Sequence, residues 1–183
     1  TQMVSKGLDF DHVSVVGILN ADSMMNYPDF RSYERAFQLM AQVVGRAGRK
    51  NRQGLVVLQT KSPDEPIIHQ VVTNDYASLY KSQMEERSLF RYPPFYRLVY
   101  VYLKHRKEDI LEQAATLMGE RVLGPDKPPV ARIQTLYIKK IVVKIEQTAS
   151  LAKVREYLLG VQQAIKEDER FRSLIVYYDV DPM

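Results

Sequence analysis

Two arginines lie among glycines in the segment "QVVGRAGR" at residues 42–49. A guanidinium group stays charged at every relevant pH and grips phosphate oxygens through two parallel hydrogen bonds, so Arg46 and Arg49 suit a nucleotide or nucleic-acid phosphate. Gly45 and Gly48 allow the backbone of this loop to approach a ligand closely. The alternative is a helix end whose cations face the negative end of the helix dipole. These residues alone leave both interpretations open.

The elements on either side of this loop predict an α/β layer. The apolar run "VSVVGILNA" at residues 13–21 is typical of a strand buried on both faces, and "LVVLQT" at 55–60 of a second one. From Tyr33 apolar residues recur at helical spacing, and this helix is expected to end near Gly45. The segment "SPDE" at 62–65 predicts a helix start, with the serine as cap and the proline in the first turn. Such alternation indicates a parallel sheet.

A joint containing two adjacent prolines, "RYPPFYR", separates this layer from a second domain. We expect domains over residues 1–91 and 92–183. The second has helices predicted over 107–122 and 150–166. Its predicted strands are "FYRLVYVYL", "VARIQ", "LYIKKIVVKIE" and "SLIVYYDVDP". The order β-α-β-β-α-β is the plan of a ferredoxin-like α+β domain, an antiparallel sheet with both helices on one face.

The composition limits the possible sites and partners. The 183 residues include no cysteine and three scattered histidines, so no metal site is predicted. No apolar run approaches the roughly 18 residues of a membrane-spanning helix, and we expect a cytoplasmic protein without membrane contacts. The net charge of +4 permits an acidic partner such as nucleic acid without requiring one.

Several segments resemble one family in order. "QVVGRAGR" resembles the Q-x-x-G-R-x-G-R signature, motif VI, of superfamily 2 helicases, and "TQMVSKGLDF" at residues 1–10 resembles their motif V. Together with "YPPF" at 92–95 and the terminal "DVDP" at 179–182, the chain is similar throughout to the C-terminal portion of the PriA family of bacterial primosomal helicases. The resemblance implies an ATP-dependent 3′-to-5′ DNA helicase that recognises stalled forks and reloads the replisome. The first domain would be the C-terminal part of the second RecA-like helicase lobe.

The resemblance also implies roles for individual residues. In such helicases ATP lies between two RecA-like lobes, and the second lobe brings arginines to the γ-phosphate. Arg49 would be the arginine finger, Arg46 its partner, and Gln42 the residue that senses the nucleotide. Motif V residues would line the nucleotide cleft or connect it to the DNA: Gly7 and Asp9 at the cleft, and Thr1, Gln2 and Lys6 toward the DNA.

The chain departs from the family in the parts that hold the nucleotide. It contains neither G-x-x-x-x-G-K-[ST] nor D-E-x-H. ATP and Mg²⁺ would therefore be bound mainly by the absent first lobe, and this fragment alone is not expected to hydrolyse ATP. The family's zinc sites need cysteines, so zinc is expected in the full-length protein only, upstream of Thr1.

The strand "LYIKKIVVKIE" carries a candidate DNA contact. Lysines there could replace the counterions of a DNA backbone, and aromatic rings could stack on bases. The alternative is that charge protects an exposed strand edge. Side chains alternate between the two faces of a strand, so the odd-numbered Lys139 is expected on the opposite face from the even-numbered Lys140 and Lys144. The candidates are Arg132, Tyr137, Lys139, Lys140 and Lys144. The resemblance implies that this domain binds branched DNA.

Other candidates concern partners and the chain end. Lys153 and Arg155 could receive the acidic tail of single-stranded DNA-binding protein, which the family recruits with other primosome proteins; ordinary solvated helix charges are the alternative. Asp179 and Asp181 point to one side of a strand, and fastening of the terminus is favoured over metal binding. Two rival functions stay open: a non-catalytic nucleic-acid or protein-binding module, and another P-loop-type ATPase or nucleotide-sensing domain.

Overall fold

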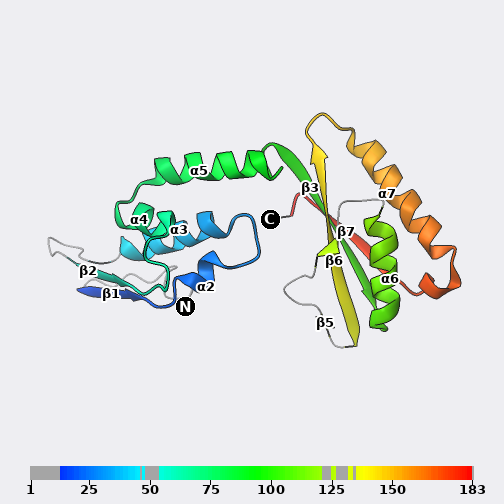
Figure 1. Ribbon diagram of the computed structural model, residues 1–183, viewed down its shortest axis with the longest axis horizontal. Coiled ribbons are helices and arrows are strands. Elements are labelled where there is room, and N and C mark those ends of the chain that lie inside the picture. Colours follow the sequence, from blue (N-terminus) through cyan, green and yellow to red (C-terminus); the bar gives the residue numbers. More distant parts are fainter. Residues whose placement is uncertain are drawn as a thin grey trace. The chain divides into compact units, whose positions relative to one another are not determined.

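The computed structural model describes residues 13–45, 47, 54–120, 125–126, 132–133 and 135–182, with the backbone alone described at 125–126 and 132–133 (Figure 1). The chain divides into two compact units, residues 1–86 and residues 87–183, called unit 1 and unit 2 below. Each unit has its own buried apolar cluster. Within the described part of the chain, no helix is long and apolar enough to cross a membrane.

Unit 1 is a small α/β arrangement in which two parallel strands pair over four residues, Val15 with Leu55 through Ile18 with Leu58. Its core consists of helix residues packed together with the end of the first strand, among them Phe37, Met40 and Ile67. The elements are β1 (Val15–Ile18), α2 (Asp22–Met25), α3 (Ser32–Val44), β2 (Leu55–Leu58), α4 (Pro66–Val72) and α5 (Tyr76–Leu89), the last of which extends into unit 2.

Helix α3 forms as its apolar spacing predicts. Ala36, Phe37 and Met40 lie on one face and are buried, which anchors the helix in the unit 1 core. The helix ends at the expected glycine, where the Gly45 amide donates to the Ala41 carbonyl oxygen at 3.0 Å. The position from which the "QVVGRAGR" loop departs is therefore set by core packing.

Two predictions for unit 1 are wrong. The strands are not buried on both faces, since Val15 and Leu55 are each 59% exposed. The described sheet has only two strands, so the outward side chains have no second layer to pack against. The predicted cap at Ser62 is also wrong: α4 begins three residues later than Pro63, with Pro66 in its first turn and Glu65 as the extended residue before it.

Unit 2 is a two-layer α+β domain. Its elements are β3 (Tyr96–His105), α6 (Glu108–Gly119), β4 (Pro125–Asp126), β5 (Arg132–Ile133), β6 (Leu136–Glu146), α7 (Leu151–Lys166), the 3₁₀ turn η1 (Glu169–Phe171) and β7 (Ile175–Val180). The antiparallel sheet has the order β4-β6-β3-β7, and β5 pairs with β6. Of the strand expected at "VARIQ", the described residues Arg132 and Ile133 pair with β6, and α6 ends three residues before the predicted Val122.

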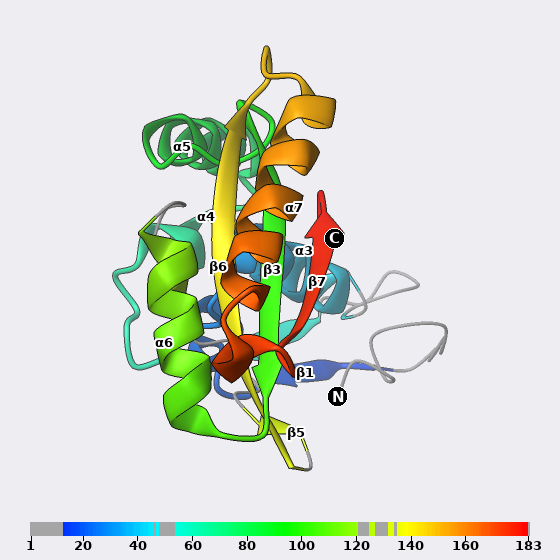
Figure 2. The same ribbon diagram turned by 90° about the vertical axis from the view of Figure 1, so that its right-hand side faces the viewer.

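Helices α6 and α7 lie on the same face of this sheet (Figure 2). Strand residues at alternate positions, such as Val101, Leu103 and Ile141, face Leu111 and Leu158 of the helices, and all five are buried. The side chains between them in the sequence point to the opposite side, which we call the open face. The alternation of β3 and β6 thus gives the sheet one helix-covered face and one open face.

Candidate functional site

The residues predicted to act on the nucleotide lie largely outside the described part of the chain. Gln42 is described, and it is exposed on the last turn of α3, three residues before the glycine that ends the helix. The other predicted residues of that site and of motif V lie outside the described residues: Arg46, Arg49, Thr1, Gln2, Lys6, Gly7 and Asp9. The side chain of Arg132 also lies outside them, although its backbone pairs with Tyr137.

Lys139 lies on the helix-covered face of the sheet. Its Nζ is 2.8 Å from Glu112 Oε1 of α6, and its side chain is 11% exposed. Tyr137 is on the same face, where it packs against the core cluster of unit 2. This placement does not support the predicted DNA contacts of Lys139 and Tyr137, because both side chains pack between the sheet and its helices.

Lys144 fastens the segment that leads into β3. Its Nζ donates to the Phe90 carbonyl oxygen at 2.5 Å and lies 3.8 Å from the centre of the Tyr92 ring. Burial lowers the pKa of Lys144, and the charge of Arg91 lowers it further. The ammonium is thus used within unit 2, and its role as a DNA contact is not supported by this placement.

The open face carries three tyrosines side by side. Tyr100 and Tyr102 alternate along β3, and Tyr177 of β7 lies directly opposite Tyr102. The Tyr102 and Tyr177 rings are stacked, 4.7 Å apart at 9°, and Tyr100 meets Tyr102 edge-on at 6.3 Å. The Lys104 and Lys140 ammonium groups each lie 4.7 Å from a ring centre, of Tyr177 and of Tyr100 respectively. Of the predicted lysines, only Lys140 belongs to this group.

From the sequence, the tyrosines of "FYRLVYVYL" could stack on bases, but alternating strand burial was the favoured explanation, and Lys104 was not among the predicted site residues. The spacing of Tyr100, Tyr102 and Lys104 at every second residue of a strand was the available signal, since it places them on one face. The contribution of Tyr177 could not be found in the same way, because it depends on the pairing register between strands 70 or so residues apart.

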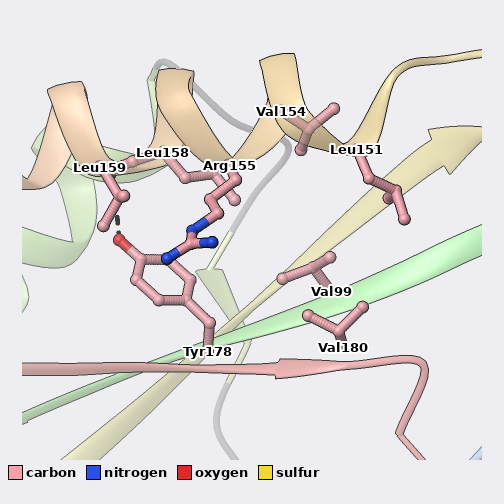
Figure 3. A pocket seen from close by; sticks show the side chains of 8 residues that line it. All are labelled: Val99, Leu151, Val154, Arg155, Leu158, Leu159, Tyr178 and Val180. Carbon is pink, nitrogen blue, oxygen red and sulfur yellow. Dashed lines mark hydrogen bonds between the residues drawn. The ribbon is translucent and has the colours of Figure 1, made fainter.

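A groove of about 320 Å³ lies between α7 and strands β3 and β7 (Figure 3). Its lining is apolar except at two side chains, Arg155 and Tyr178. Arg155 reaches from the helix toward Tyr178, whereas Lys153 is exposed and does not line the groove. The lining residues are Val99, Leu151, Val154, Arg155, Leu158, Leu159, Tyr178 and Val180.

Tyr178 closes one end of this groove. Its hydroxyl lies 2.8 Å from Gln162 Oε1 and 3.2 Å from the Leu158 carbonyl oxygen. Burial raises the pKa of Tyr178 to about 12, because the phenolate would lose its hydration. The hydroxyl is therefore held as a neutral donor between β7 and α7.

This pKa shift predicts a specific loss of stability at high pH. In the unfolded chain Tyr178 ionises near its ordinary pKa of 10, before the folded form does. Its contribution to stability is complete below pH 10 and is lost as the pH rises toward about 12. Urea unfolding measured across this range should show a steeper decline for the native chain than for Tyr178→Phe. Tyr157→Phe, on the exposed side of α7, should follow the native slope; parallel slopes for all three would contradict the prediction.

The end of β7 is fastened to β3. The Arg97 guanidinium forms an ion pair with Asp181, with Nε 3.1 Å from Oδ2, and the Asp181 amide donates to the Leu98 carbonyl oxygen at 2.8 Å. The Arg97 hydrogen bond lowers the pKa of Asp181. Asp179 instead pairs in register with Tyr100 on the open face.

Among the described residues no cluster of three potential metal ligands occurs.

Comparison with known proteins adds to this geometry. The family model of the primosomal protein N C-terminal domain matches residues 88–183, which cover unit 2 almost completely. The chain belongs to the PriA family. The replication restart protein PriA of Bacillus subtilis is 35% identical over 194 residues, covering 100% of this chain and 24% of that protein. PriA of Synechocystis is 34% identical over 193 residues, with 100% and 22% coverage.

A shorter and stronger similarity is found to PriA of Chlamydia pneumoniae, which is 44% identical over 99 residues, 54% of this chain and 13% of that protein. The chain thus spans about a quarter or less of the length of these PriA relatives. Two of the three matches extend through both units, so unit 1 as well as unit 2 is similar to the PriA proteins.

Proposed function

We propose that this chain is the C-terminal part of an ATP-dependent 3′-to-5′ DNA helicase of replication restart, which recognises stalled forks and reloads the replisome. The observation that carries the proposal is similarity over the whole chain to proteins named for replication restart. In the full-length protein Arg46 and Arg49 would assist ATP hydrolysis. ATP and Mg²⁺ would be held mainly by a first lobe, zinc would be bound elsewhere in the full-length protein, and the protein would act in the cytoplasm.

Helix α3 supports this role for the arginines. Its buried residues fix the helix in the unit 1 core, and the helix ends at Gly45, next to Arg46 in the sequence. The exposed Gln42 lies at the same end. Arg46 and Arg49 follow this helix end in the sequence, and their guanidinium groups could neutralise charge that develops on the transferred phosphoryl group. The parallel pairing of β1 and β2 around α3 supports assignment of unit 1 to a RecA-like lobe.

DNA-stimulated ATP hydrolysis by the full-length protein tests the proposal. Arg49→Ala is expected to abolish hydrolysis while DNA binding persists. Undiminished hydrolysis would remove Arg49 from the mechanism. If the full-length protein binds forked DNA but hydrolyses no ATP, the alternative of a non-catalytic binding module takes its place.

Unit 2 would bind DNA within this enzyme. Its strand order β4-β6-β3-β7, with both helices on one face, supports the ferredoxin-like assignment, and neither α6 nor α7 covers the other face of the sheet. Of the lysines predicted to contact DNA, the geometry favours Lys140, whose ammonium is on the open face. Unit 2 would also receive primosome proteins.

The groove beside α7 is our candidate for the acidic tail of single-stranded DNA-binding protein. Apolar walls suit the aliphatic or aromatic side chains of a peptide, and Arg155 could pair with a carboxylate at the groove. Lys153 lies on the same helix without lining the groove, so it could add only long-range attraction.

Replacement of Arg155 should therefore weaken tail binding more than replacement of Lys153. We expect Arg155→Ala to raise the Kd for a fluorescent tail peptide about tenfold, the usual cost of one charge-assisted hydrogen bond. Lys153→Ala should change it by about twofold or less at moderate salt. Anisotropy titrations measure both values. Equal effects of the two substitutions would show that the peptide is held by general charge rather than by the groove.

A further inference from the structure

The open face of unit 2 combines aromatic rings and ammonium groups in one place. We propose that this face is a stacking platform for the bases of single-stranded DNA. The inference deepens the proposed function, on which it rests for the identity of the nucleic acid. It assigns the contact to Tyr177, stacked on Tyr102, with Lys104 serving the phosphates.

The strand register builds the platform. Tyr102 and Tyr177 are directly opposite each other on adjacent antiparallel strands, about 4.8 Å apart, which is close to the 4.7 Å between their ring centres. The stack needs no rearrangement to form, since both rings stand on regular strands. Tyr100, two residues along β3, meets Tyr102 edge-on and supports it from the side.

The aromatic surface is accessible where the stack ends. Tyr177 is 39% exposed, and its neighbour Ile175 is 48% exposed on the same face of β7. A hydroxylated ring at the surface of a sheet presents both an apolar surface and a polar edge, as nucleobases do. A base would lie against Tyr177 in place of the Lys104 ammonium and would extend the stack begun by Tyr102.

The charges on the open face suit a polyanion. Lys104 Nζ lies over the Tyr177 ring, so this cation is within one side chain's reach of the phosphate of a base stacked there. Lys140 Nζ lies over the Tyr100 ring, and Lys140 is only 8% exposed. Asp179 lies on the same face beside Tyr100 and opposes phosphate binding at that end. The Tyr177–Lys104 end is accordingly the more favourable one for DNA.

Single-stranded DNA fits these features better than duplex DNA. A tyrosine ring can stack only on a base whose face is available, and duplex bases already stack on one another. Stacking tolerates every base, so binding should show little sequence preference and a marked salt dependence. Both properties would suit a domain that meets DNA at forks of arbitrary sequence.

The test uses the 183-residue chain and a fluorescent oligo-dT of about 16 nucleotides. Tyr177→Leu keeps an apolar side chain and removes the ring; we expect the Kd to rise about fivefold to a hundredfold. Tyr177→Phe keeps the ring and should bind as the native chain does. Tyr157→Leu, exposed on α7, is the matched control and should leave the Kd unchanged.

Two further measurements separate stacking from charge. An abasic oligonucleotide of the same length should bind the native chain more weakly than oligo-dT, and Tyr177→Leu should bind the two equally. Lys104→Gln should reduce the slope of log Kd against log salt by about one, whereas Tyr177→Leu should keep the native slope. Because the chain contains no tryptophan, quenching of tyrosine emission by oligo-dT gives an independent readout.

The outcomes distinguish this inference from the function on which it rests. If the native chain binds oligo-dT and Tyr177→Leu binds it equally well, the platform is overturned while DNA binding by unit 2 stands. Tighter binding to duplex DNA or to oligo-rU than to oligo-dT would likewise overturn it. If the native chain binds no DNA at low salt, both the platform and DNA binding by unit 2 fail. Should Tyr177→Leu not fold, Lys104→Gln and the abasic comparison decide.

Discussion

In the full-length protein, Arg49→Ala is expected to lower DNA-stimulated ATP hydrolysis by about 10³-fold or more. A guanidinium that contacts the γ-phosphate stabilises charge that appears only in the transition state, so its removal slows hydrolysis without weakening the binding of DNA. Initial rates of phosphate release at saturating DNA measure the change, and anisotropy with a labelled fork measures DNA binding in the same preparation.

Arg35→Ala provides the matched control for this experiment. Arg35 is on α3, close in sequence to the loop, and its guanidinium pairs with Asp29 at 3.4 Å. Its side chain is substantially exposed, so we expect a small effect on stability and on hydrolysis. A comparable loss in both variants would mean that the loop is sensitive to charge in general. Hydrolysis by Arg49→Ala within threefold of native would exclude Arg49 as an arginine finger.

Phe171→Ala is expected to lower the free energy of unfolding of unit 2 by about 3–5 kcal/mol. Phe171 is 1% exposed and lies in the η1 turn between α7 and β7, where it belongs to the core cluster formed by the sheet and both helices. Truncation removes buried apolar surface and leaves a cavity that the packed sheet cannot close. Urea unfolding followed by circular dichroism measures the loss.

The same variant tests whether the two units unfold separately. The clusters of buried residues have no member in common, and the unit 1 cluster ends at Leu79. We therefore expect Phe171→Ala to shift only the unit 2 transition. Phe95→Ala, at a side chain 39% exposed in the joint before β3, should cost about 1 kcal/mol or less. A single transition that shifts as a whole would show that the units unfold together.

Features that depend on neighbours along the chain could be predicted from the amino-acid sequence. Helix α3 and its end at Gly45 followed from apolar residues three and four apart, and α7 matches the helix predicted over 150–166 to within one residue. The alternation of side chains along β6 likewise predicted that Lys139 lies on the opposite face from Lys140 and Lys144. The predicted start of α4 was wrong, because Pro66 rather than Pro63 lies in the first turn of the helix.

The contacts of each candidate side chain depend on how the strands and helices pack. Lys139 and Lys140 are adjacent in the sequence, yet one pairs with Glu112 of α6 and the other lies over a tyrosine on the open face. The stack of Tyr102 on Tyr177 joins strands that are far apart in the sequence. These contacts arise from strand register and from which face the helices cover, and both are set by the packing of the whole domain rather than by any local run of residues.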